Sequence, residues 1–484
     1  MQTTIQESAA TNRHRLAKNR RAETRRLFEE DVVRKSTSRA SAAEQRVAVC
    51  YREISELRLD ARNPRLHSPK QVRQIARSIQ AFGFVVPVLL DAKLKVVAGH
   101  GRVMACRLLG RSQVPTISLD HLSETQIRAF AIADNRLTEN SEWNDRLLAE
   151  QLRDLAVLDL DFDLEATGFE MAEIDLRIEG LTSESEDAGL ADAIPQMANG
   201  PAVSRPGDLW ELGVHRVCCG NALDPAAFRA LLGKDKAAMA FIDPPYNVRI
   251  EGNVSGFGKI HHREFAMACG EMSDDEFASF LTEAFMLLVR YSTSGSIHFV
   301  CMDWRHLVQL VEAGLDAYTE FKNLCIWAKD TAGMGSFYRS AHELVFVFKN
   351  GRARHRNNVQ LGEFGRDRTN VWHYPGAIGL RTSDEGNLLA LHPTVKPVKL
   401  IADAIMDTSR RGDIVLDSFL GSGTTVIAAE RTGRRCYGLE IDPLYTDTVV
   451  RRWQTYSGES ARHLPTNRTF KQIESEREVA DVAR

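Results

Sequence analysis

One segment, residues 413–442, constrains the fold of this chain more than any other. It runs from an apolar strand into a turn with Gly421 and Gly423, then through an alanine-rich helix to a second strand that carries Glu440. Glycine permits a tight turn and close approach of a ligand, and the start of the helix offers free N–H groups. Glu440 follows Gly421 by 19 residues, close to the spacing at which an acid holds ribose hydroxyls. The segment predicts a strand–helix–strand unit that binds a nucleoside.

The turn departs from the patterns that bind phosphate groups. A Walker loop needs a Lys before its hydroxyl residue, whereas Gly423 precedes Thr424, and Val426 replaces the third glycine of the dinucleotide fingerprint. These departures favour a nucleoside ligand without a pyrophosphate. S-adenosyl-L-methionine is such a ligand, and Asp417 at the end of the first strand could hold its ammonium group.

A second strand end carries the most distinctive side chains of the chain. The apolar run 237–242 stops at Asp243, Pro244, Pro245 and Tyr246. Proline cannot continue a sheet ladder, so the chain must leave the sheet there in a stiff turn. This turn presents a carboxylate, a carbonyl and a flat ring, which are the groups needed to hold an exocyclic amine and stack on its base.

The remainder of the second half alternates between strands and helices. Apolar strands are predicted at 297–301, 324–328 and 344–348, and helices at 274–289 and 304–313. This alternation predicts an α/β domain with a mainly parallel sheet and helices on both faces. Ligands bind such sheets at the carboxyl ends of the strands.

Taken together, these motifs resemble those of the DNA amino-methyltransferases. Residues 243–246 match the DPPY motif and residues 419–424 match F-x-G-x-G-T, in the order of the β class of that family. Residues 392–397 resemble its HPTxKP motif. Residues 220–223 resemble its GDxL stretch, although Asn221 stands where Asp is usual.

The resemblance implies a Rossmann-like, S-adenosyl-L-methionine-dependent methyltransferase that acts on double-stranded DNA. Its target would be the N6 amine of an adenine rotated out of the duplex, a rotation that costs a few kcal/mol. It implies a catalytic role for Asp243, Pro244, Pro245 and Tyr246, and cofactor binding by Asp417, Phe419, Gly421, Gly423, Thr424, Glu440 and Lys396.

Several alternatives remain open at this level. Cytosine N4 is the nearest alternative target, although family members that methylate it more often have Ser in place of Asp243. RNA methyltransferases use related turns, and the chain could also be a ParB-like DNA-binding or regulatory protein with a vestigial methylase domain. Asn247 could hydrogen-bond at the rim of the pocket or simply cap the turn.

The first half predicts a separate α+β domain at residues 49–181. Its strand, followed by Gly99, His100, Gly101 and Arg102 at the start of a helix, resembles the junction that binds nucleotide phosphate in the ParB/sulfiredoxin-like domains. His100 and Gly101 replace the Glu and first Arg of the ParB motif GERR, which argues against CTP hydrolysis. A possible nucleotide or anion site is therefore predicted at Gly99, His100 and Arg102.

The domain organisation follows from these motifs and from composition. Residues 13–39 hold ten Lys or Arg against four Asp or Glu, which predicts a basic arm that could track DNA phosphates. The predicted parts are an arm at 1–48, the ParB-like domain at 49–181, a linker at 182–206, the methyltransferase domain at 207–456 and a polar tail at 457–484. Target recognition is expected within 248–270 and 351–391, where basic and aromatic residues mix.

Composition limits the remaining possibilities. The formal net charge is -3, so a nucleic-acid protein of this balance must segregate its basic residues. Eight scattered cysteines suggest reduced thiols and a cytoplasmic location. Neither the Cys218–Cys219 pair nor the His261–His262 pair has the spacing of zinc ligands, so no metal is predicted. No membrane span is expected, and a homodimer is one expected assembly, because the β class often dimerises.

Overall fold

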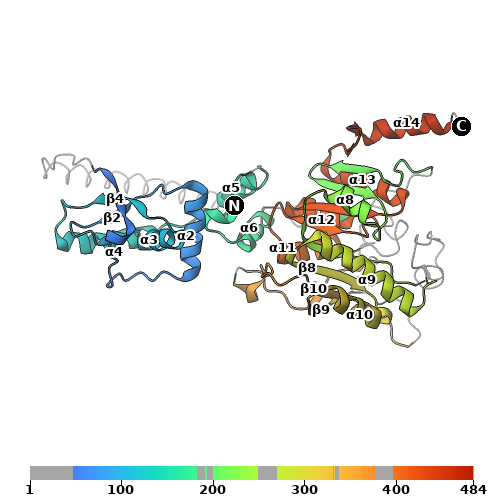
Figure 1. Cartoon of the computed structure of the whole chain (residues 1–484), viewed down its shortest axis with the longest axis horizontal. Helices are drawn as coiled ribbons and strands as arrows, with labels where there is room; N and C mark the ends of the chain where they lie inside the picture. Colours follow the sequence, from blue (N-terminus) through green and yellow to red (C-terminus); the bar gives the residue numbers. More distant parts are fainter. Residues whose placement is uncertain are drawn as a thin grey trace, which may run out of the picture. The chain divides into compact units, whose positions relative to one another are not determined.

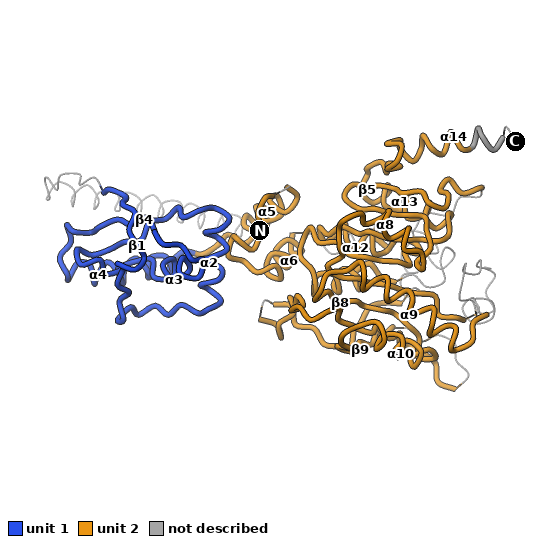
Figure 2. The backbone as a smooth tube through the Cα atoms, in the orientation of Figure 1, with its two compact units in different colours: residues 1–141 blue, residues 142–484 orange. Residues whose placement is uncertain are grey.

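The computed structural model describes residues 47–158, 160–181, 191–192, 200–248, 270–330, 332, 337–363, 365–376 and 396–482. The chain divides into two compact units, Met1–Ser141 and Glu142–Arg484 (Figure 2). Each unit has its own sheet and its own buried apolar cluster. The two units are therefore described separately.

The first unit contains a four-stranded sheet in the order β1-β4-β2-β3; its strands β2 and β4 are labelled in Figure 1. β2 and β4 are parallel, and the other neighbouring strands are antiparallel. Val88, Val96, Val103 and Val114 form its core together with Cys106. The elements are β1 (Val49–Glu53), η1 (Ile54–Glu56), α2 (Pro69–Phe82), β2 (Val88–Leu90), β3 (Val96–Ala98), α3 (His100–Leu108), β4 (Gln113–Ser118) and α4 (Glu124–Glu139).

The second unit contains an eleven-stranded mixed sheet in the order β11-β9-β10-β8-β7-β12-β13-β6-β5-β14-β15. Its central strands, from β8 to β6, are parallel, and the strands β10, β5, β14 and β15 run antiparallel to their neighbours. The prediction of an α/β fold is confirmed, with parallel strands confined mainly to the centre. The strands are β5 (Leu209–Leu212), β6 (His215–Cys219), β7 (Ala237–Ile242), β8 (Ser292–Met302), β9 (Glu320–Ala328), β10 (His342–Lys349), β11 (Val371–His373), β12 (Ile414–Asp417), β13 (Arg435–Glu440), β14 (Arg462–His463) and β15 (Arg468–Thr469).

Helices cover both faces of this sheet. Alternation along β7 places Met239 and Phe241 in the cluster that contains α11, α12 and α13, and Ala240 and Ile242 in the cluster that contains α8, α9 and α10. None of the described helices combines the length and apolar character needed to cross a bilayer. The helices are α8 (Pro225–Leu232), α9 (Asp274–Tyr291), η3 (Trp304–His306), α10 (Leu307–Ala317), η4 (Gln360–Gly362), α11 (Val398–Thr408), α12 (Thr424–Thr432), α13 (Pro443–Ser457) and α14 (Phe470–Val482).

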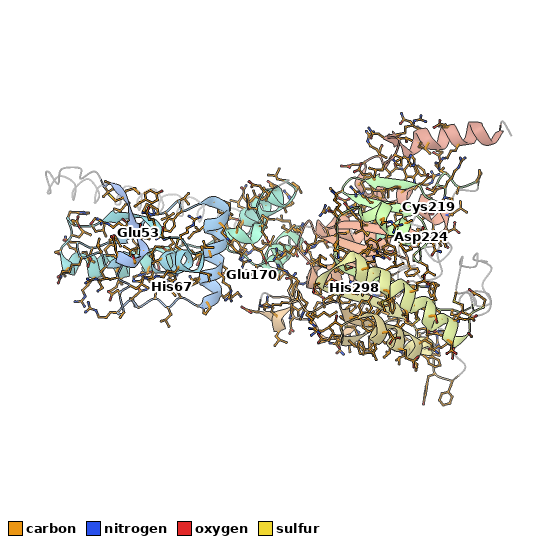
Figure 3. All side chains as sticks on the ribbon, in the orientation of Figure 1. Glu53, His67, Glu170, Cys219, Asp224 and His298 are labelled. Atoms are coloured by element: carbon orange, nitrogen blue, oxygen red, sulfur yellow. The ribbon has the colours of Figure 1, made fainter. Side chains whose placement is uncertain are left out.

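Side chains pack the sheet interior, and some of them are polar. His298 on β8 is fully buried (Figure 3). Its Nδ1 lies 3.0 Å from the Tyr318 hydroxyl, and its Nε2 lies 3.1 Å from the Ser296 hydroxyl. Burial lowers the pKa of His298 to about 3, so the ring is neutral and serves the packing of the sheet.

Residues 142–181 belong to the second unit, whereas the sequence analysis assigns them to the ParB-like domain. This segment contains α5 (Asp145–Ala156), η2 (Leu164–Thr167) and α6 (Met171–Glu179). Asp175 on α6 pairs with Arg434 and Arg411, and Glu165 pairs with Arg356. These ion pairs to the domain of the large sheet explain the difference, because pairing across hundreds of residues leaves no local pattern.

The C-terminal segment is also part of the second unit, although its composition predicts a polar tail from residue 457. β14 pairs with β5, and Phe470 and Ile473 of α14 are buried against the core. Arg477 on the same helix forms an ion pair with Asp208. Two apolar residues three positions apart are enough to anchor one face of an otherwise polar helix.

Candidate functional site

The two predicted motifs meet at one edge of the large sheet. β7 and β12 are parallel neighbours, and their register aligns Leu416 with Ala240. Asp243 follows the last residue of β7, and Asp417 is the last residue of β12. Both carboxylates therefore leave the sheet at its carboxyl edge, where open α/β sheets bind ligands.

Both oxygens of Asp243 accept hydrogen bonds from neighbouring side chains. The Tyr246 hydroxyl donates to Oδ1 at 2.8 Å, and Lys396 Nζ donates to Oδ2 at 2.6 Å. The Asp243 side chain is 22% exposed, while that of Lys396 is 3% exposed. The two hydrogen bonds thus fix the orientation of the Asp243 carboxylate, and part of the carboxylate stays accessible.

Glu343 completes this cluster from a distant part of the chain. It lies 3.1 Å from Lys396 Nζ and 3.2 Å from the Tyr246 hydroxyl, and it also pairs with Lys329. Because β10 is antiparallel to β8, the start of β10 lies at the same edge as the end of β8. Glu343 has no sequence signal of its own, because a glutamate at the start of a strand has no distinguishing pattern.

The charged groups in this cluster shift one another's pKa values. Burial raises the pKa of Asp243, an effect that Lys396 opposes and Glu343 reinforces. Burial also disfavours the Glu343 carboxylate, but Lys396 and Lys329 lower its pKa to about 2. Burial disfavours the Lys396 ammonium, yet the two carboxylates raise its pKa above the usual range. Lys396 is thus a buried cation between two acids, and its described polar contacts are with Asp243, Glu343 and Tyr246 rather than with the glycine turn.

The Asn247 side chain connects the turn after Tyr246 to Gly270 and Met272. Its Nδ2 donates to the Met272 carbonyl at 2.8 Å, and its Oδ1 accepts from the backbone N–H groups of Gly270 and Met272 at 3.0 and 3.3 Å. Asn247 has a φ of 52°, a conformation that Asn tolerates better than most residues. These contacts give Asn247 a structural role, because they hold the turn against the segment that precedes α9.

The glycine turn has the geometry that its sequence predicts. Gly421 N–H donates to Glu440 Oε2 at 2.7 Å, which ties the turn to the end of β13. Gly423 has a φ of 82°, and a Cβ at this position would lie 2.8 Å from Val449 Cγ1. Glycine is therefore required at position 423 for both backbone and packing reasons. α12 begins immediately after it.

Asp417 and Glu440 form a pair of buried acids beside this turn. Burial raises the pKa of Asp417 to about 7 and that of Glu440 to about 8. Asp417 accepts from the Thr425 hydroxyl at 2.6 Å and from Phe419 N–H at 2.9 Å. Within the described part of the chain, neither acid has a cationic partner. A ligand with an ammonium group and ribose hydroxyls, such as S-adenosyl-L-methionine, fits these acids.

Thr424 has a structural contact that the sequence analysis did not anticipate. Its hydroxyl accepts from Arg452 Nη1 at 3.1 Å, and the same guanidinium contacts the Ser422 carbonyl at 3.1 Å. Arg452 is 2% exposed, and burial lowers its pKa to about 10. Arg452 therefore stabilises the turn by hydrogen bonds from the buried side. The position of Arg452 on an ordinary amphipathic helix gives no sequence signal for this role.

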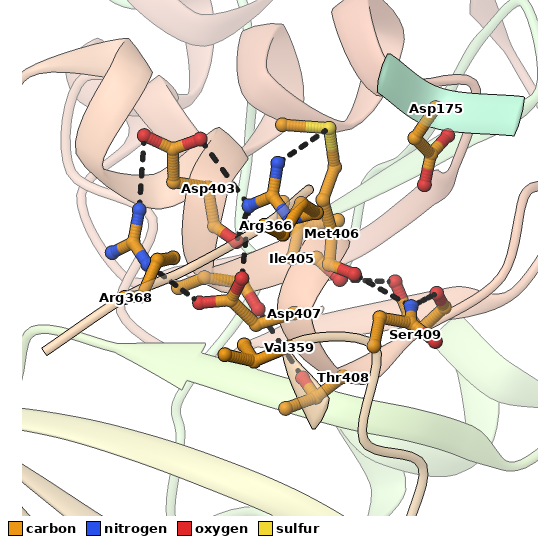
Figure 4. A network of polar contacts seen from close by, with 12 residues as sticks. Asp175, Val359, Arg366, Arg368, Asp403, Ile405, Met406, Asp407, Thr408 and Ser409 are labelled. Atoms are coloured by element: carbon orange, nitrogen blue, oxygen red, sulfur yellow. Dashed lines mark hydrogen bonds and ion pairs between the residues drawn. The ribbon is translucent and has the colours of Figure 1, made fainter. Parts of the chain in front are cut away.

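Two arginines of the segment 351–391, where DNA contacts are predicted, form a buried network of ion pairs within the protein (Figure 4). Arg366 lies 2.8 Å from Asp407 and 3.4 Å from Asp403, and Arg368 lies 2.9 Å and 3.1 Å from the same two acids. Arg366 is 6% exposed. The expectation that these two arginines contact DNA is corrected, because Asp403 and Asp407 lie on one face of α11 and neutralise both guanidinium groups. Trp372 and Tyr374 are buried as well.

In the first unit, Gly99, His100 and Arg102 lie together at the start of α3. Gly99 has a φ of 103°, and the position of its absent Cβ lies 3.1 Å from the Arg102 guanidinium. His100 Nε2 accepts from Asp60 N–H at 3.3 Å, and Arg102 Nη1 donates to the Val86 carbonyl at 2.8 Å. Nucleotide binding at these residues stays a prediction.

Several predicted features lie outside the described residues. They are the basic arm up to residue 46, most of the linker at 182–206, residues 249–269 and residues 377–395. Of the HPTxKP motif, only Lys396 and Pro397 are described. Among the described residues there is no group of three or more His, Cys, Asp or Glu arranged to hold a metal ion.

Three protein-family models match successive parts of the chain. The model of a DNA methylase family that acts on N6 or N4 amines matches residues 237–451. A ParB-methyltransferase HTH domain matches residues 146–206, which include α5 and α6. A ParB N-terminal domain matches residues 36–136.

Individual proteins resemble separate parts. The ParB-like nuclease domain-containing protein YnaK of Escherichia coli (strain K12) is 44% identical over 82 residues, which is 17% of this chain and 94% of YnaK. The orphan methyltransferase M.BamHII of Bacillus amyloliquefaciens is 38% identical over 105 residues, which is 22% of this chain and 38% of that protein. The solved PvuII DNA methyltransferase (cytosine-N4-specific) is 14% identical, with a TM-score of 0.37, and the match covers 55% of this chain and 98% of that one.

The family assignment agrees with the motifs and with the site. S-adenosyl-L-methionine is the methyl donor of the N6/N4 methylases, and the acids Asp417 and Glu440 suit it. Residues 237–451 therefore form an N6/N4 DNA methylase domain, and a ParB N-terminal domain and a ParB-methyltransferase HTH domain precede it in the chain.

Proposed function

We propose that this DNA methyltransferase acts on the N6 amine of adenine. The observation that carries the proposal is the carboxylate of Asp243, held by Tyr246 and Lys396 with one edge exposed. Family members that methylate cytosine N4 more often have Ser at this position. A carboxylate also accepts an amine N–H more strongly than a hydroxyl does.

The chemistry of this proposal assigns a task to each residue. The amine of adenine is a poor nucleophile, because its lone pair is delocalised into the ring. Asp243 and the Pro244 carbonyl each accept one N–H, so the nitrogen moves toward tetrahedral geometry and the lone pair becomes available. The negative charge of Asp243 also stabilises the positive charge that develops on nitrogen.

Tyr246 and the acids beside the glycine turn position the two reactants. The Tyr246 ring offers a stacking surface to the flipped base, worth roughly 1–3 kcal/mol. Asp417 holds the ammonium group of the cofactor, and Glu440 holds its ribose hydroxyls. When bound, S-adenosyl-L-methionine supplies an electrophilic methyl group on a positively charged sulfur. Holding the amine and this methyl group in line supplies the entropic part of catalysis.

The base is tested by expressing the whole chain in a host that lacks DNA methylation. Host DNA is digested to nucleosides and analysed by mass spectrometry, and the same DNA is sequenced for modified positions. N6-methyldeoxyadenosine at a recurring site is the expected product. N4-methyldeoxycytidine would instead establish the cytosine alternative, and modified RNA without modified DNA would contradict the proposal.

A further inference from the structure

The acids and bases around Asp243 form one connected chain of contacts. Lys396 Nζ lies 2.6 Å from Asp243 and 3.1 Å from Glu343, so one ammonium group joins the two carboxylates. The Tyr246 hydroxyl also lies between them, at 2.8 Å and 3.2 Å. Glu343 is thereby connected to Asp243 through two separate donors.

Glu343 is itself restrained on its other side. It pairs with Lys329, which follows the last residue of β9. The Glu343 side chain is 14% exposed and that of Lys396 is 3% exposed. Without Glu343, Lys396 and the Tyr246 hydroxyl would have Asp243 as their only carboxylate partner among the described residues.

We propose that Glu343 and Lys396 are positioning residues for methyl transfer, which together hold the Asp243 carboxylate as an ionised and oriented acceptor for the target amine. This proposal rests on the function proposed above. Lys396 supplies the positive charge that keeps Asp243 ionised, and Glu343 balances that charge and fixes where Lys396 and Tyr246 lie. Both residues act through Asp243.

The two residues must influence the ionisation of Asp243 in opposite directions. Loss of the Lys396 charge raises the pKa of Asp243, whereas loss of the Glu343 charge lowers it. The groups facing Asp243 from the surrounding elements are Lys396, Glu343, Tyr246, Cys301 and Asp417.

The test measures the single-turnover rate of methyl transfer to DNA against pH for the full chain. Lys396→Met should move the acid limb of this profile to higher pH, and Glu343→Gln should move it to lower pH, each by about one pH unit or more. Both variants should slow methyl transfer at least tenfold at the pH optimum, and Lys396→Arg should restore the position of the limb.

Controls separate this proposal from other outcomes. Glu320→Gln makes the same chemical change at the opposite end of the β9–β10 pair, where Glu320 contacts Lys322 and Lys349, and should leave the limb in place. Calorimetric binding of S-adenosyl-L-methionine reports whether each variant folds, and its affinity should change less than about threefold.

Two results would overturn the proposal at once: an acid limb of the pH profile that stays in place in both variants, or one that moves in the same direction in both. If Lys396→Met loses affinity for S-adenosyl-L-methionine while the acid limb of its pH profile stays in place, Lys396 is a cofactor ligand, and the proposal is overturned as well. A wild-type chain that methylates no DNA would instead refute the proposed function.

Discussion

Arg434 and Asp175 form a two-point ion pair in which neither side chain is exposed, although 259 residues separate them. Each guanidinium nitrogen donates to one carboxylate oxygen, at 2.9 and 2.8 Å. Arg411 adds a third contact at 3.0 Å. The pair fixes α6, within the segment that matches the HTH domain, to the methylase sheet.

Removal of Arg434 should therefore destabilise the second unit. Arg434→Ala leaves the Asp175 carboxylate buried without its main partner, which costs about 3–5 kcal/mol. Thermal unfolding of the full chain checks the expected loss, and hydrogen exchange should show faster exchange in α6. Lys399→Ala is the matched control, because Lys399 is 54% exposed and lies 3.6 Å from Glu179 of the same helix. An equal effect of the two substitutions would contradict a structural role for the buried pair.

Arg368 should contribute to stability rather than to DNA binding. Its ion pairs with Asp403 and Asp407 are largely buried, so Arg368→Met should lower the melting temperature. The slope of log affinity for DNA against log salt concentration should not change. A slope smaller by about one would reveal a phosphate contact and contradict this expectation.

The affinity for S-adenosyl-L-methionine should rise between pH 6 and pH 8. Asp417 and Glu440 have pKa values raised to about 7 and about 8, above those of the unfolded chain. The unfolded chain ionises these acids near pH 4, whereas the folded protein keeps them protonated up to these raised values, so the stability of the free protein falls between about pH 4 and pH 8. An ammonium group beside Asp417 favours the ionised form, so the cofactor should raise the melting temperature more at pH 8 than at pH 6. Adenosine, which lacks the amino acid, should show a weaker pH dependence; equal increases with the cofactor at both pH values would contradict the assignment.

The hydroxyl and the ring of Tyr246 should have separable effects. Tyr246→Phe keeps the ring but removes the 2.8 Å hydrogen bond to Asp243, worth about 1 kcal/mol or more. Single-turnover methylation should slow about tenfold while DNA affinity stays unchanged. Tyr246→Ala should weaken the binding of DNA with an extruded base in addition. If the two variants behave alike, the hydroxyl does not contribute separately.

Features encoded by neighbouring residues were predictable from the sequence. The turn with Gly421 and Gly423, the acids Asp417 before it and Glu440 after it, and the strand that leads into Asp243 all depend on local patterns of glycine, proline and apolar residues. The structure places these residues at one sheet edge, as the predicted topology requires. The parallel centre of the sheet follows from the same alternation of strands and helices.

Features that depend on pairing between distant residues were not predictable. Glu343 reaches Asp243 only because β10 is antiparallel and begins at the carboxyl edge. Arg366 and Arg368 form part of a basic and aromatic segment, yet both form ion pairs with two acids on α11 inside the fold. A single sequence does not tell whether a cation faces DNA or an acid of its own chain.

The most direct test of the account is methyl transfer by the Asp243→Ala chain. With tritiated S-adenosyl-L-methionine and DNA that contains the recognition site, the wild-type chain should transfer label to DNA. The variant should transfer none while it still binds the cofactor, because Asp243 contacts Tyr246 and Lys396 and makes no hydrogen bond to the glycine turn among the described residues. Asn247→Ala, which loses hydrogen bonds to Met272 and Gly270 but none to Asp243, should retain measurable transfer. Turnover by Asp243→Ala at the wild-type rate would contradict the assignment of this carboxylate to the reaction.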